Sequence, residues 1–255
     1  MPKRALAASL STLTVIALCC APLARAETIN VAVAASLQYV FDDLAAAFNK
    51  ESGDKAVASL GASGKLATQI RNGAPFGVFL SADVETPQAL FDAGLSTDAP
   101  RIYGYGSLVL WTTAELDLKN WQAALENPAV QHIAVANPKT APYGREAMRL
   151  LTGLKLDAKL APKLVYGESI QQVNQYVVSR AAEVGFTAKS VVVSPEVHGV
   201  GRWVELPRHL YQPIAQGAVL MKNASPAAAR FYAFLYKPAA RAIWQQYGYQ
   251  LPEEH

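Results

Sequence analysis

The 255-residue sequence predicts an α/β protein of two lobes, each with a mostly parallel sheet flanked by helices. Short apolar runs rich in β-branched residues alternate with longer segments whose apolar residues have helical spacing. These strand–helix units fall into two clusters, and a chain of this length can bury two modest cores. With 51% hydrophobic and 17% charged residues, the composition excludes a disordered chain.

The first cluster opens with the run TINVAVA at 28–34, which is typical of a buried strand. The segment that follows has apolar residues at Val40, Phe41, Leu44 and Phe48, which is helical spacing. We expect strands at 28–34, 56–60 and 77–80 and helices at 39–50 and 65–71.

The second cluster repeats the alternation, and two helical segments close the chain. We expect strands at 107–112, 132–136, 164–166, 184–187 and 214–221. We expect helices at 121–125, 144–151, 169–180, 227–236 and 239–247.

The N-terminus has the pattern of a secretory signal peptide. Lys3 and Arg4 precede an apolar stretch of small residues, and Ala24-Arg25-Ala26 forms a small-x-small cleavage site. Serines and threonines interrupt the apolar stretch, which is shorter than the ~20 residues of a membrane span. We therefore expect cleavage near Ala26 and a free, soluble protein in an exported compartment. Both cysteines lie inside this segment, so the mature chain should contain no disulfide and no cysteine metal site.

The charge balance also depends on the signal segment. Three of the 23 basic residues lie in the first 26 positions, where there are no acidic residues. The mature chain then has 20 basic and 20 acidic residues, and its neutrality argues against nucleic acid or an anionic membrane as the partner.

Four loops share one design, in which a strand ends, small and hydroxyl residues follow, and a helix begins. They are AASL at 34–37, GASGK at 61–65, APYG at 141–144 and GESI at 167–170. Ligands bind at such carboxyl-end loops in open α/β sheets. Helix starts offer unpaired N–H groups and a partial positive charge, so several of them together would hold a small oxyanion.

Other interpretations stay open. Ser36, Ser63 and Ser169 occur where serines commonly cap helices, with or without a ligand. An exported hydrolase would explain the signal peptide, but the four histidines lie in unrelated contexts and no G-x-S-x-G motif occurs. A receptor for a small organic anion would need an arginine for the carboxylate, and Arg145 is close enough to Tyr143 to keep this alternative.

A set of short motifs, in order over nearly all of the mature chain, resembles the periplasmic molybdate-binding proteins of molybdate ABC transporters, which belong to the type II periplasmic binding protein superfamily. The matching pieces are AASL at 34–37, GASGKL at 61–66, NGAP at 72–75, VFLSAD at 78–83, NP at 137–138, APYG at 141–144 and YGY at 247–249.

This resemblance implies a two-lobed receptor, monomeric, whose cleft closes on molybdate or tungstate through neutral donors and which delivers the ion to the membrane permease of an ABC importer. It implies no enzymatic activity, no cofactor and no metal-ion ligation beyond the bound oxyanion. Sulfate or another small oxyanion is the alternative ligand. The implied contacts are Ser36 and Ser63 from the first lobe and Tyr143 and the Ile170 N–H from the second, with Ala35, Ser169 and Thr187 as further candidates.

The resemblance also implies that the chain crosses between the lobes near Gly106 and near Gln216. The signal peptide would then cover 1–26, the first lobe 27–106 plus 217–255, and the second lobe 107–216, with the terminal helices returning to the first lobe.

One departure concerns the second lobe. Many family members carry a ligand-binding tyrosine where this chain has Ala188. Tyr143 is the candidate replacement, through its hydroxyl or its backbone N–H, and we favour the N–H because Gly144 would let the chain approach an anion at a helix start. We expect Glu168 to point to solvent or to cap backbone, because a carboxylate would repel a dianion that has no proton to donate. We expect Lys65, two residues after Ser63 on a new helix, to be solvated.

Overall fold

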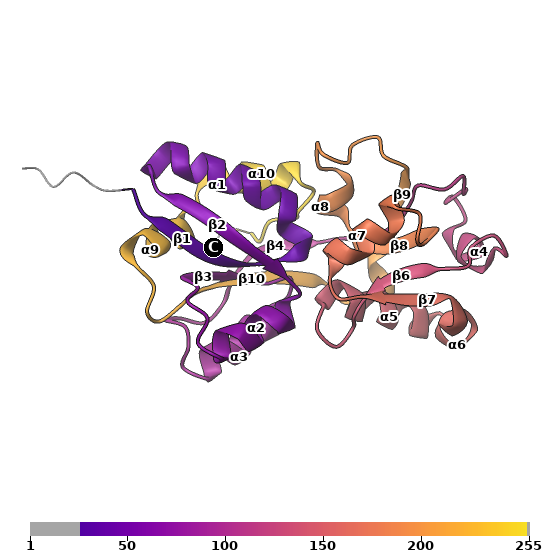
Figure 1. Cartoon of the computed structure of the whole chain (residues 1–255), viewed down its shortest axis with the longest axis horizontal. Coiled ribbons are helices and arrows are strands. Elements are labelled where there is room, and N and C mark those ends of the chain that lie inside the picture. Colours follow the sequence, from indigo (N-terminus) through magenta and orange to yellow (C-terminus); the bar gives the residue numbers. More distant parts are fainter. Residues whose placement is uncertain (1–25, 254–255) are drawn as a thin grey trace, which may run out of the picture.

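The computed structural model describes residues 26–253, so the predicted signal peptide lies outside the described residues apart from Ala26. Two five-stranded sheets lie side by side, each with its own helices, and they form the two lobes (Figure 1). The predicted two-lobed α/β fold is therefore confirmed.

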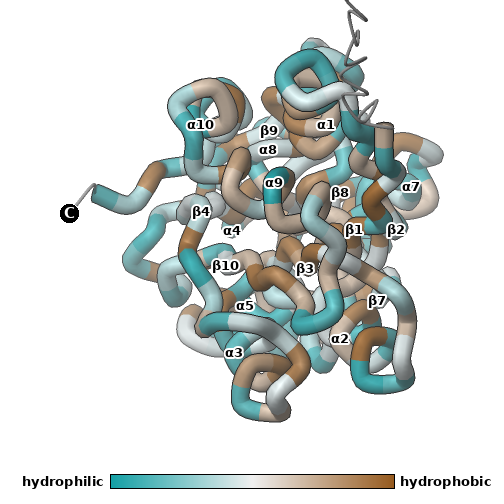
Figure 2. The backbone as a smooth tube through the Cα atoms, turned by 90° about the vertical axis from the view of Figure 1, so that its left-hand side faces the viewer, coloured by the Kyte–Doolittle hydropathy of each residue, from teal (hydrophilic) through white to brown (hydrophobic). Residues whose placement is uncertain are grey.

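The first lobe is built on a sheet of order β2-β1-β3-β10-β4. Its strands are β1 (Thr28–Ala34), β2 (Lys55–Gly61), β3 (Val78–Leu80), β4 (Arg101–Gly106) and β10 (Ile214–Leu220). Its helices are the 3-10 turn η1 (Ala35–Leu37), α1 (Gln38–Ser52), α2 (Ser63–Arg71), α3 (Glu85–Asp92), α9 (Pro226–Phe234) and α10 (Pro238–Gln246). Figure 1 shows α1 and α10 on one side of the sheet and α2 and α3 on the other, and Figure 2 shows apolar strand segments between these layers.

The second lobe is built on a sheet of order β7-β6-β8-β5-β9. Its strands are β5 (Leu108–Thr112), β6 (Ile133–Ala136), β7 (Leu164–Gly167), β8 (Val184–Ala188) and β9 (Arg202–Glu205). Its helices are α4 (Trp121–Glu126), α5 (Pro142–Gly153), α6 (Asp157–Leu160), α7 (Ile170–Val178) and α8 (Lys189–Val192), with 3-10 turns η2 (Ala161–Lys163) and η3 (Arg208–Leu210).

Both sheets are mostly parallel in strand direction, as expected, with one strand in each that runs against the other four. In the first sheet β1 pairs parallel with β2 and β3, whereas β10 pairs antiparallel with β3 and β4. In the second sheet β6 pairs parallel with β7 and β8, whereas β5 pairs antiparallel with β8 and β9. The two reversed strands are β10 and β5, because β5 follows β4 without a helix and only the 3-10 turn η3 separates β10 from β9.

The chain passes between the sheets twice. It leaves the first sheet where β4 ends at Gly106 and enters the second where β5 begins at Leu108. It returns between Glu205, the end of β9, and Ile214, the start of β10. Residues 214–216, which the resemblance places in the second lobe, thus lie in a strand of the first sheet. Where each lobe begins and ends as a folding unit stays a prediction.

The terminal segment packs on the first lobe through aromatic rings. Tyr103 of β4 stacks on Trp244 of α10 with ring centroids 4.5 Å apart, and Tyr249 meets Trp244 edge-on at 5.4 Å. All three rings are buried, so α10 and the residues after it are fixed beside the passage between the lobes. Within residues 26–253, no helix combines the length and the hydropathy needed to cross a membrane.

Candidate functional site

A small cavity of about 10 Å³ lies where the strand ends of the first lobe face the helix starts of the second. All four of the predicted loops contribute residues to it, and it is lined by Ser36, Ser63, Tyr143 and Ile170 among others. The complete lining is Ala34, Ala35, Ser36, Gly61, Ala62, Ser63, Ala82, Ala141, Pro142, Tyr143 and Ile170. The described residues that line the cavity are uncharged, and five of them are alanines whose methyl groups leave room only for a small ligand.

Ser36 presents a hydroxyl that has no protein partner. It lies in η1 directly after β1, and its side chain is buried. Among residues 26–253 no group hydrogen-bonds to its Oγ, although a buried hydroxyl is normally paired. The Ser36 carbonyl does have a partner, since Ser190 Oγ donates to it over 2.9 Å. A buried, unpaired hydroxyl at the wall of a cavity is suited to donate to a ligand.

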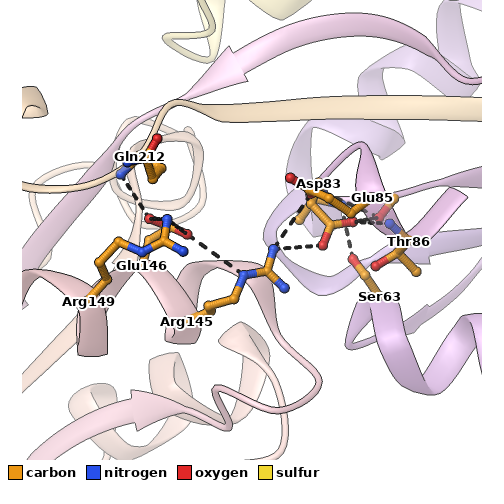
Figure 3. Close-up of polar contacts among 10 residues, drawn as sticks. Ser63, Asp83, Glu85, Thr86, Arg145, Glu146, Arg149 and Gln212 are labelled. Carbon is orange, nitrogen blue, oxygen red and sulfur yellow. Dashed lines mark hydrogen bonds and ion pairs between the residues drawn. The ribbon is translucent and has the colours of Figure 1, made fainter. Parts of the chain in front are cut away.

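Ser63 accepts one hydrogen bond from the protein and keeps its proton for a ligand. It is the first residue of α2 and only 1% exposed. Its Oγ accepts a hydrogen bond from the Ala82 backbone N–H at 3.0 Å (Figure 3). A serine hydroxyl has one proton to donate, and here no protein acceptor is recorded for it among the described residues. The capping interpretation is wrong for both serines, because neither side chain caps the helix that begins beside it.

Two helix starts face the cavity from the second lobe. α5 begins at Pro142 and α7 at Ile170, and the first N–H groups of a helix have no intrahelical acceptor. Tyr143 and Ile170 thus offer backbone donors beside two serine hydroxyls. Gly144 has a packing role that the sequence did not show, because a Cβ at this position would collide with the Ala136 carbonyl where α5 packs closely on β6.

The Tyr143 hydroxyl points to a partner at the passage between the lobes. Gln216 Nε2 donates to it over 2.8 Å, and Gly106 lies so close that a Cβ there would collide with both groups. Burial raises the pKa of Tyr143 well above the ordinary value of a phenol, so the hydroxyl is neutral. Ala188, at the end of β8, is fully buried and is not among the residues that line the cavity.

Two further candidates are not brought to the cavity. Thr187 is fully buried in β8, and its Oγ1 donates to Asn174 Oδ1 at 2.6 Å. Ser169 precedes α7 in an extended conformation, and its side chain neither caps the helix nor lines the cavity. Ala35, the third of these candidates, does line it.

Glu168 and Lys65 behave as the sequence predicts, with one addition. Both side chains are exposed, and Lys65 Nζ lies 2.6 Å from Glu168 Oε1. The Glu168 backbone N–H donates to Gln172 Oε1 at 2.6 Å. The carboxylate is therefore turned away from the cavity, and the ion pair connects the two lobes at the surface.

Sequence reasoning missed an ion pair with a buried carboxylate next to the cavity. Asp83 follows Ala82, has a side chain only 5% exposed, and receives Arg145 Nη2 from the second lobe at 2.9 Å (Figure 3). Ser81 Oγ and the Thr86 N–H also donate to this carboxylate, at 2.9 and 3.1 Å. The motif VFLSAD contains Asp83, but nothing in it indicates a partner 62 positions later. Because Arg145 is engaged by Asp83, it is not free to bind the carboxylate of an organic ligand.

The structure also joins the lobes through backbone and hydroxyl contacts around the cavity. The Gly64 N–H donates to the Thr140 carbonyl at 3.0 Å, and a Cβ at Gly64 would press on the Thr140 backbone at 3.2 Å. No group of three or more histidine, cysteine or carboxylate side chains that could hold a metal ion occurs in the described part of the chain. The arrangement can therefore enclose a small anion with neutral donors from both sides.

Comparison with known proteins identifies the family. The model of the bacterial extracellular solute-binding protein family matches residues 29–250. The molybdate-binding protein ModA of Azotobacter vinelandii is 40% identical over 232 residues, which cover 89% of this chain and 92% of that protein. ModA of Rhodobacter capsulatus is 39% identical over 231 residues, which cover 89% and 90%.

A solved structure agrees with the sequence relatives. The periplasmic molybdate-binding protein of Azotobacter vinelandii superimposes with a TM-score of 0.84 at 33% identity, over 88% of this chain and 100% of that one. With a match over nearly the whole described chain in sequence and in fold, this protein belongs to the bacterial extracellular solute-binding proteins, and among them to the ModA family.

Proposed function

We propose that this protein is a periplasmic receptor that captures molybdate and delivers it to the permease of an ABC importer. One observation carries the choice of an anion as ligand: the buried Ser36 hydroxyl, which has no partner in the described part of the chain, lines a cavity whose lining is uncharged. Relatives at 40% and 39% identity that are named for molybdate binding favour this oxyanion.

The donors on the cavity wall suit an anion without protons. Ser36 and Ser63 would donate through their hydroxyls, Tyr143 and Ile170 through their backbone N–H groups, and Ala35 through its own N–H at the start of η1. A protonated phosphate needs an acceptor for its proton, and no carboxylate lines this cavity in the described chain. Molybdate and tungstate, both tetrahedral dianions, fit such a set of donors better, and sulfate is the competing ligand.

The remaining parts of the proposal concern the cell. Export through the signal peptide at 1–26 would place the mature protein in the periplasm, where it would act as a monomer without a cofactor. Binding rather than catalysis agrees with membership of a solute-binding family. No observation supports the hydrolase alternative. The organic-anion alternative needs an arginine for the ligand's carboxylate, and Arg145 is instead paired with Asp83.

Calorimetric titration of the purified mature protein with molybdate, tungstate, sulfate and hydrogen phosphate tests the proposal. We expect tight binding of molybdate and tungstate, weaker binding of sulfate and almost none of phosphate. A ligand that binds only the folded state also raises its stability, by about 4 kcal/mol at a thousandfold excess over the dissociation constant. If phosphate stabilises the protein as much as molybdate does, the oxyanion assignment is wrong.

A further inference from the structure

Gln216 is a fully buried carboxamide that lies behind the cavity rather than on its wall. It sits in β10, at a shift of register against β4, in the first strand after the chain returns from the second lobe. Its side chain meets hydroxyl groups from both lobes, which is unusual for one residue at a passage between domains. The contacts that it makes decide which groups it can influence.

One branch of contacts leads to the second lobe. Gln216 Nε2 donates to the Tyr143 hydroxyl at 2.8 Å, and Tyr143 lines the cavity. On its other side, the amide is held by Tyr103, whose hydroxyl lies 2.9 Å from Gln216 Oε1 and 2.7 Å from the Ser81 carbonyl. Tyr103 is itself fixed by stacking on Trp244. The amide is thus anchored in the first lobe while it holds a side chain of the second.

A second branch leads to Ser36 in the first lobe. Tyr103, whose hydroxyl lies 2.9 Å from Gln216 Oε1, packs edge-on against the Tyr249 ring, with ring centroids 6.4 Å apart. Tyr249 donates to Ser190 Oγ at 3.2 Å, and Ser190 Oγ donates to the Ser36 carbonyl at 2.9 Å. These residues are all buried. This series of contacts therefore ends at Ser36, whose own hydroxyl has no partner among the described residues.

From this geometry we infer that Gln216 is a positioning residue for the anion site, because its carboxamide fixes Tyr143 directly and is linked to Ser36 through Tyr103, Tyr249 and Ser190. The inference rests on the proposed function, since it presumes that an anion binds between Ser36 and Tyr143. Gln216 itself does not touch the anion. Its amide places one contact of each lobe at the spacing that the ligand requires, and Gly106 leaves the space for the bond to Tyr143.

Binding measurements on Gln216→Leu, alone and combined with Tyr143→Phe or Tyr249→Phe, test this role. Leucine has a similar volume but no polar group, so the buried Tyr143 hydroxyl loses its donor while Tyr103 keeps the Ser81 carbonyl as its acceptor. We expect about a tenfold loss of molybdate affinity for Gln216→Leu, the scale of an unsatisfied buried polar group. Because the tyrosine variants break the same branches, the loss from Gln216→Leu should shrink in each of these backgrounds. An unchanged loss in both backgrounds, or no loss at all, overturns the inference.

A pH profile provides a readout that a merely structural role would not move. In Gln216→Glu the introduced carboxyl is buried, so its pKa is raised. As a carboxylate it can only accept, whereas in its protonated form it regains a donor for Tyr143. Molybdate affinity of this variant should therefore rise as the pH falls from 8 to 6, with little change in the wild-type protein. A profile parallel to the wild type contradicts the role, and this comparison also decides the matter if Gln216→Leu does not fold.

Thr112→Val is the matched control. Thr112 is fully buried at the far end of β5, and its Oγ1 donates to the Glu183 carbonyl at 2.5 Å. This variant also loses a buried hydrogen bond, so its melting temperature should fall while its molybdate affinity stays at the wild-type value. If it loses affinity like Gln216→Leu, general destabilisation explains both. Wild-type protein that binds sulfate but not molybdate would refute the proposed function alone, and the same cycles would then be measured with sulfate.

Discussion

The Ser63 hydroxyl accepts a hydrogen bond from the Ala82 backbone N–H, 3.0 Å away, and so ties α2 to the segment that follows β3. Ser36, the other serine of the cavity, has no such partner among residues 26–253. Of two serines that face the same cavity, Ser63 thus also stabilises the fold, whereas Ser36 does not. Their alanine variants should separate the effect on stability from the effect on binding.

Ser63→Ala should reduce both affinity and stability. The variant removes a donor to a charged ligand, a loss of about 1.5 to 3 kcal/mol in binding. It also leaves the Ala82 N–H buried without an acceptor, which costs about 1 to 3 kcal/mol in the free energy of unfolding. Calorimetry with molybdate and urea unfolding of the ligand-free protein measure the two effects. Wild-type affinity would show that Ser63 has only the structural role.

Ser36→Ala should reduce affinity alone. Its hydroxyl has no hydrogen-bond partner among residues 26–253, so the free energy of unfolding should stay within about 0.5 kcal/mol of the wild type. Molybdate binding should again weaken by about 1.5 to 3 kcal/mol. The same two measurements apply, and the informative result is the contrast with Ser63→Ala. A variant that unfolds more easily but binds normally would argue against a ligand role for Ser36.

Arg145→Met should weaken the contact between the lobes more than Lys65→Met does. Asp83 is nearly buried, so without Arg145 its carboxylate keeps only neutral donors, whereas Lys65 and Glu168 are both exposed. Because Arg145 is itself 41% exposed, we expect a loss on the order of 1 kcal/mol in molybdate binding, against a few tenths for Lys65→Met. Titrations of both variants at low and at high salt measure this. Equal losses would show that the burial of Asp83 does not matter.

Gly144→Ala should destabilise the second lobe, with Gly153→Ala as its control in the same helix. A Cβ at Gly144 would collide with the Ala136 carbonyl, whereas a Cβ at Gly153 would have no atom within 4 Å. We expect a loss of about 1 to 3 kcal/mol in the free energy of unfolding for Gly144→Ala, and a gain of up to about 1 kcal/mol for Gly153→Ala. Urea unfolding followed by circular dichroism distinguishes the two. A neutral Gly144→Ala would mean that α5 can move away from β6.

Local pattern was sufficient for many elements and for part of the site. The strand predicted at 28–34 coincides with β1, and the loops that follow β1 and β2 do bring Ser36 and Ser63 to one cavity. Strand ends and helix starts can be read from neighbouring residues. Strands of low apolar content, such as β9 with its sequence RWVE, and β4 with two glycines, lack that signal and were missed.

Side-chain direction and long-range pairing could not be read in the same way. Thr187 lies in a strand that is buried over its whole length, so alternation does not reveal which side faces a ligand, and its hydroxyl pairs with Asn174. The partners Asp83 and Arg145, or Tyr143 and Gln216, are 62 and 73 positions apart. Contacts of this kind depend on how two lobes meet, which no local pattern in one sequence specifies.

The contacts around the cavity have a kinetic consequence. A ligand held between Ser36 and Ser63 on one side and Tyr143 and Ile170 on the other is covered by both lobes, which the Gly64 N–H bond to the Thr140 carbonyl also joins. Departure of the ion therefore requires the lobes to separate first, so the residence time equals the waiting time for opening. Substitutions at the interface of the lobes should then change the dissociation rate much more than the association rate, even where they never touch the ion.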